Sequence, residues 1–157
     1  AVQFEMRDAY NNDEIHPLDL SERAFLKKVK PLVGNSCVAN VSYDGSAYAY
    51  ATDDIDVMFG LFGLDPDEDS QIIRRGLNRI ATDPDVKAAA QREGVKYVLQ
   101  LDEGCKNGSF SKDASINLMT YQKVEWNGIM QINEATPGFE LVLSEGDMRL
   151  YRITALD

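Results

Sequence analysis

The sequence predicts an α/β fold: a mixed, mainly parallel sheet of about five strands with flanking helices and a C-terminal antiparallel hairpin. Up to residue 101, short apolar runs alternate with amphipathic helical patterns, as in sheets whose parallel strands are joined by helices. Two further apolar runs near the C-terminus flank the sequence Ser-Glu-Gly-Asp, which is typical of a hairpin turn. The 157 residues, of which 44% are hydrophobic, suit one domain with a sizeable core.

We expect a single α/β domain over residues 19–157. Residues 1–18 mix charges, Asn and Pro17 without apolar periodicity, which predicts a linker or a loosely docked arm. Residues 102–137 are rich in Gly, Ser, Asn and Lys, and they predict an irregular insertion within the domain.

The first helix is predicted from residues 19–22, Asp-Leu-Ser-Glu, which match a capping box. Apolar residues then recur on one helical face, at Phe25, Leu26, Val29 and Leu32. Pro31 predicts that the regular helix ends near that residue, before Gly34. Residues 37–41 form a short apolar run between two turn sequences and predict the first strand.

The middle of the chain predicts further alternation of helix and strand. Residues 46–52 are Ala-rich and predict a short helix, and residues 56–59 predict a second strand. Acidic residues 67–69 precede an amphipathic helical pattern, which is carried by Ile72, Ile73, Leu77 and Ile80. Asp83 and Pro84 predict the start of another helix, and Gly94 its end.

The remaining strands follow from their composition. Residues 95–101 carry the clearest strand pattern in the sequence. Residues 139–143 and 148–153 predict the two strands of the hairpin.

The charge balance limits the classes of partner. Sixteen basic and twenty-six acidic residues give a net charge of −10 and a pI near 4.5, so the molecule as a whole repels phosphate backbones and anionic lipid surfaces. We therefore expect no nucleic-acid partner. No apolar run approaches the roughly 20 residues that span a bilayer, and we expect the chain to be a soluble piece of a larger protein.

The residues that usually carry catalysis or bind zinc are scarce. Cys37 and Cys105 are too few for a zinc site, and we expect them at opposite edges of the sheet, too far apart for a disulfide. His16, the one histidine, lies in the N-terminal arm, so a Ser-His-Asp or Cys-His arrangement is not readily assembled. No phosphate-binding or nucleophile motif is present. We assign no catalytic residue, metal or cofactor.

The turn after the first strand is the candidate ligand site. Asn40, Asp44, Gly45 and Ser46 place polar groups where a strand ends and a helix begins, the usual position of ligands in open α/β sheets. Tyr48 adds an aromatic ring and a hydroxyl that suit a carbohydrate. The alternative interpretation is structural: Asp44 and Ser46 form the turn and cap the helix, and Tyr48 packs in the core.

Two other interpretations stay open. Residues 65–70 carry alternating acids like a calcium loop, but Ser70 and Gly76 stand where an EF-hand needs Gly and Glu, which leaves a calcium-dependent interaction module as an alternative. A stand-alone carboxylate-dependent glycosidase, using Asp44 and Asp102 near strand ends, is the other.

Several segments, taken in order, carry a resemblance to a known family. They are the helix through Phe25 and Leu26, the strand at 38–40, the sequence Tyr-Asp-Gly-Ser-Ala-Tyr-Ala-Tyr at 43–50, residues 83–86 and 94–99, and the terminal segments 138–142 and 150–153. Over residues 20–154 the chain resembles the C-terminal soluble domain of large actinobacterial multi-spanning membrane proteins. Those proteins are similar to C-superfamily glycosyltransferases, which use polyprenyl-phosphate sugars outside the membrane.

The resemblance implies a domain on the extracytoplasmic face of the cell membrane, with the membrane-spanning part of the parent chain as its partner. Catalysis in such enzymes is placed on loops of the membrane part. The leading hypothesis is therefore a non-catalytic domain that assists carbohydrate acceptor binding or assembly.

Overall fold

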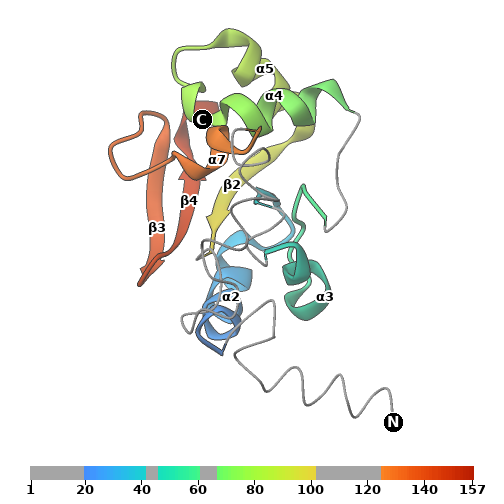
Figure 1. Cartoon of the computed structure of the whole chain (residues 1–157), viewed down its shortest axis with the longest axis vertical. Helices are drawn as coiled ribbons and strands as arrows, with labels where there is room; N and C mark the ends of the chain where they lie inside the picture. Colours follow the sequence, from blue (N-terminus) through green and yellow to red (C-terminus); the bar gives the residue numbers. More distant parts are fainter. Residues whose placement is uncertain (1–19, 42–45, 61–66, 102–124) are drawn as a thin grey trace, which may run out of the picture.

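A four-stranded sheet forms the centre of the computed structural model, which describes residues 20–41, 46–60, 67–101 and 125–157. The strands are β1 (Cys37–Ala39), β2 (Val95–Gln100), β3 (Phe139–Glu145) and β4 (Met148–Ile153), in the spatial order β1-β2-β4-β3. β1 and β2 are parallel, whereas β4 is antiparallel to both β2 and β3. The α/β class and the C-terminal hairpin are confirmed (Figure 1).

The five mainly parallel strands that the sequence predicts are not found in the described parts of the chain. Residues 56–59 make a single parallel bridge, Val57 to Val38, instead of a second strand. There the Val38 amide donates to the Asp56 carbonyl at 2.8 Å and the Met58 amide donates to the Val38 carbonyl at 2.9 Å. The sheet is mostly antiparallel because the hairpin adds β4 directly to β2, so two of the three strand pairs involve the hairpin.

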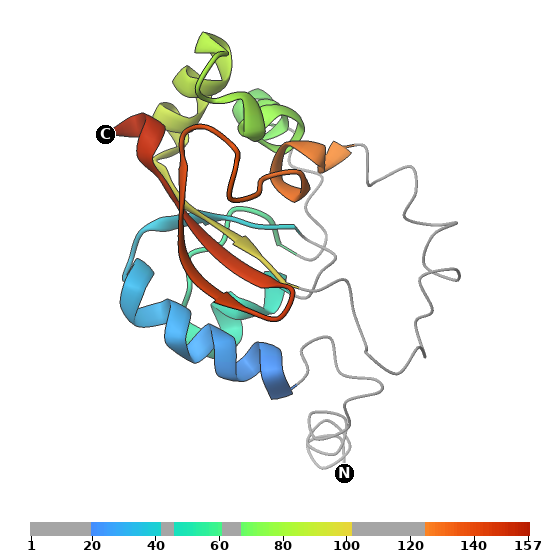
Figure 2. The same cartoon turned by 90° about the vertical axis from the view of Figure 1, so that its left-hand side faces the viewer.

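Helices cover both faces of this sheet. On one face lie α4 (Glu68–Gly76), η2 (Leu77–Arg79), α5 (Pro84–Glu93) and α7 (Asn127–Met130); on the other lie α2 (Leu20–Val33), η1 (Ser46–Tyr48) and α3 (Ala49–Asp53) (Figure 2). A short turn, η3 (Thr154–Leu156), ends the chain. Two hydrophobic cores result, one on each side of the sheet. None of the helices in the described parts is long and apolar enough to cross a bilayer.

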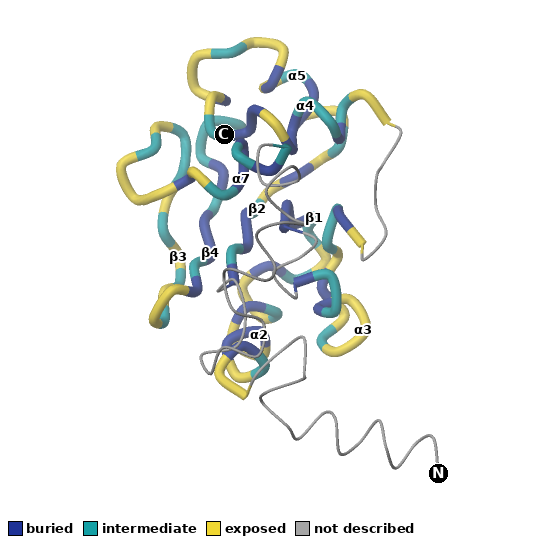
Figure 3. The backbone as a smooth tube through the Cα atoms, in the orientation of Figure 1, coloured by how far each residue is buried: buried dark blue, intermediate teal, exposed yellow. Residues whose placement is uncertain are grey.

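Strands β2 and β4 contribute to both cores because successive side chains of a strand point to opposite faces. Val98 pairs with Tyr151, and both lie in the core under α4 and α5. Leu99 pairs with Leu150, and both lie in the core under α2. The tube coloured by burial shows these two central strands largely buried and β3 more exposed (Figure 3).

The predicted helix boundaries are close to those observed. Asp83 caps α5, since its carboxylate accepts from the amides of Asp85 at 3.0 Å and Val86 at 3.4 Å, and Pro84 occupies the first turn. Gly94 ends α5 with a left-handed φ of 69°. The capping box at 19–22 and the arm at 1–18 begin outside the described residues.

Helix α2 differs in one detail. It continues through Pro31 to Val33, so the proline lies inside the last turn and the helix ends two residues after it. The buried face therefore ends with Val33, and Leu32, which we expected in the core, is 44% exposed.

Helices α4 and α7 cross at very close range. A Cβ atom on Gly128 would lie 2.4 Å from the Gly76 amide nitrogen and 2.7 Å from the Arg74 carbonyl oxygen, both backbone atoms of α4. Only glycine permits this approach, because backbone atoms have no rotamer that moves them away. The contact holds α7 over the core, where Ile129 is fully buried.

We expect Gly128→Ala to lower the free energy of unfolding by about 2–3 kcal/mol, because the added methyl group forces the two helices apart. Chemical denaturation followed by circular dichroism measures the change. Gly60→Ala is the matched control, since nothing lies within 4 Å of a Cβ at that position, and it should be nearly neutral. Equal stability of both variants would contradict the close crossing.

Candidate functional site

The turn after β1 is built around the side chain of Asn40, which is fully buried. Its Oδ1 accepts from the Phe59 amide at 2.8 Å, and its Nδ2 donates to the Phe59 carbonyl at 2.8 Å. The same Nδ2 donates to the Ser46 hydroxyl at 3.0 Å. Asn40 therefore imitates a strand partner for Phe59 and fixes residues 55–59 beside β1.

Ser46 completes this network at the start of η1. Its hydroxyl donates to the Val41 carbonyl at 2.9 Å while accepting from Asn40. These bonds tie together the two ends of the segment 42–45. Asp44 and Gly45, the other predicted polar residues of this turn, lie outside the described residues.

Tyr48, the tyrosine of the predicted site, and its neighbour Tyr50 differ in exposure. Tyr48 is half-buried and packs against the core under α2, whereas Tyr50 is 66% exposed on α3. The structure thus brings Asn40, Ser46 and Tyr48 to one corner of the fold. It gives the first two structural hydrogen bonds, and ligand binding at this corner stays a prediction.

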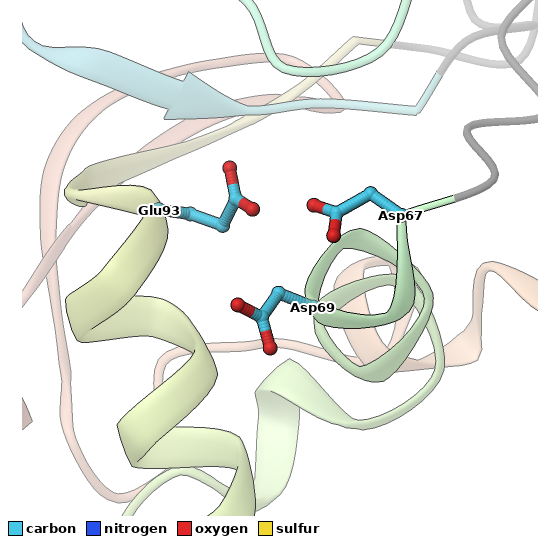
Figure 4. Close-up of side chains that lie close together, drawn as sticks. All are labelled: Asp67, Asp69 and Glu93. Atoms are coloured by element: carbon cyan, nitrogen blue, oxygen red, sulfur yellow. The ribbon is translucent and has the colours of Figure 1, made fainter.

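An acidic cluster lies elsewhere, between the N-terminus of α4 and the C-terminus of α5. One carboxylate oxygen each of Asp67, Asp69 and Glu93 lie within 4.8 Å of one another, and Figure 4 shows the Asp67 and Glu93 carboxylates facing each other beside Asp69. It is the one group of three potential metal-ligating side chains in the described ranges. Residues 67–69 were noted in the sequence, but Glu93 is distant in sequence and was missed.

Neighbouring groups already satisfy part of this cluster. Arg92 forms a two-pronged contact with Asp69, with N–O distances of 2.8 and 2.7 Å. These hydrogen bonds hold the pKa of Asp69 below its ordinary value of 3.8. The Ser70 hydroxyl donates to Asp67 at 3.1 Å, and hydrogen bonding, first with Glu93 and then with Ser70, lowers the pKa of Asp67. A cation at this position would compete with Arg92 for Asp69. The closeness of the three carboxylates is therefore not enough to assign a calcium site.

A buried arginine links α4 to the segment before α7. The Arg74 side chain is 5% exposed, and its Nη2 contacts the Glu125 carboxylate at 3.1 Å. Its guanidinium lies 5.5 Å from the Trp126 ring centroid, and Trp126 packs edge-to-face against Phe59 with ring centroids 4.8 Å apart. Arg75 also contacts Glu125, at 2.7 Å, and hydrogen bonds from Arg75, together with charge from both arginines, lower the pKa of Glu125.

These contacts give Trp126 a structural role. The indole is 4% exposed and covers the core, so it is not an exposed stacking residue. Sequence periodicity could not find the contact, because Trp126 belongs to a weakly patterned stretch that is far from Arg74 along the chain.

The cysteine in the described region has no catalytic features. Cys37 is a free thiol at the start of β1, and burial, followed by the charges of Asp56 and Glu93, raises its pKa to about 11. The thiol is therefore protonated at neutral pH, which disfavours a nucleophilic role. Cys105 lies outside the described residues, so the expectation about a disulfide is not tested.

Comparisons with known proteins place the chain in a family. Residues 2–155 match a family of unknown function, DUF6541, and the chain belongs to that family. None of the curated proteins compared with it matches.

Among solved structures, the chain is similar to the C-terminal globular domain of an oligosaccharyltransferase from Archaeoglobus fulgidus. The TM-score is 0.53 at 13% sequence identity, over 87% of this chain and 98% of that domain. At this identity the similarity establishes a shared fold.

The Asn40 network leads to the first prediction for this region. We expect Asn40→Ala to lower the free energy of unfolding by about 3 kcal/mol, because both backbone groups of Phe59 lose a buried partner. Urea denaturation measures the loss, and Asn35→Ala, at an exposed position, is the control. A loss no larger than that of the control would contradict the structural role of Asn40.

The second prediction concerns the Asp69–Arg92 pair and pH. Because the pKa of Asp69 is lowered on folding, its stabilisation is fully present above the ordinary value of 3.8 and is lost as pH falls through the lowered pKa. The coupling between Asp69→Asn and Arg92→Gln in a double-mutant cycle should therefore be measurable at pH 7 and decrease as the pH is lowered below 3.8. A coupling that stays constant across this range would refute the assignment.

Proposed function

We propose that this chain is a non-catalytic, extracytoplasmic domain of a membrane glycosyltransferase-like protein, where it assists assembly or the binding of a carbohydrate acceptor. The observation that carries the proposal is the fold. The fold of the chain matches 98% of a domain that forms the C-terminal globular part of an oligosaccharyltransferase. Membership of a family of unknown function neither adds to this role nor conflicts with it.

The chemistry of the described residues agrees with a role other than catalysis. Asn40 and Ser46 are engaged in structural hydrogen bonds, and the Cys37 thiol is held protonated. Two acids of the one acidic cluster accept hydrogen bonds from Arg92 and Ser70. Reactive groups in an active site need partners that activate them. The hydrogen-bond partners of these side chains instead stabilise the folded structure.

Cell fractionation tests the membrane part of the proposal. An antibody raised against this 17.5 kDa chain should detect a considerably larger protein in the membrane fraction, and external protease should remove the epitope from intact cells. The soluble fraction and a cytosolic marker protein serve as controls. A protein of the size of this chain in the cytosol would overturn the assignment.

Titration with sugars tests the carbohydrate part. Tyr50 offers an exposed ring on α3, which directly follows η1 with Ser46 and Tyr48. Sugar rings stack on exposed aromatic faces. In NMR spectra of the chain, millimolar cell-envelope sugars should shift the signals of residues 46–50, and Tyr50→Ser should abolish the shifts. Val142→Ser, which changes an exposed apolar residue on β3, should leave them unchanged. Absence of shifts in the unaltered chain would count against acceptor binding.

A further inference from the structure

We draw no further inference here: the strongest candidate, the cluster of Asp67, Asp69 and Glu93 between the N-terminus of α4 and the C-terminus of α5, is a group of acidic side chains that already accepts hydrogen bonds from Arg92 and Ser70, and no second observation among the described residues points to a cation there.

Discussion

The pairing of β2 with β4 is the interaction on which the rest of the structure depends. It places Val98 beside Tyr151 on one face and Leu99 beside Leu150 on the other, so each strand contributes to both cores. A slip of one residue in this register would turn the side chains of one strand to the wrong core and disrupt the packing of both cores. The helices on either face have a place to pack only because these two strands are buried between them.

The corners of the fold are secured by polar groups instead of further strands. Asn40 holds Phe59 beside β1 through both groups of its amide, and this replaces the hydrogen bonds that a full second strand would make. Gln100 plays a similar part at the end of β2, where its Nε2 donates to the Ile129 and Ile132 carbonyls at 2.7 and 3.0 Å. These two hydrogen bonds, together with the close contact between Gly128 and the backbone of α4, hold α7 on the sheet. Side-chain amides used in this way stabilise the fold and are not available to bind a ligand.

The surface features divide between the two helical layers. The α4/α5 layer carries paired charges, such as Asp69 with Arg92 and Arg75 with Glu125, as expected for a surface that faces water. The layer of α2 and α3 also carries charge pairs, Lys28 with Glu145 and Lys30 with Asp54. In addition it carries the exposed side chains of Leu20, Leu32 and Tyr50.

The sequence by itself determined the local structure wherever caps and periodicity were strong. Asp83, Pro84 and Gly94 bounded α5, the spacing of Ile73 and Leu77 gave the helical α4–η2 segment, and the Ser-Glu-Gly-Asp turn gave the hairpin. The tertiary structure alone decided the strand order, the antiparallel majority and the short bridge at Val57. It also decided that Glu93 lies beside Asp67 and that Arg74 lies over Trp126. Caps and periodicity act within a few residues of the chain, whereas these contacts join segments that are brought together only when both cores are closed.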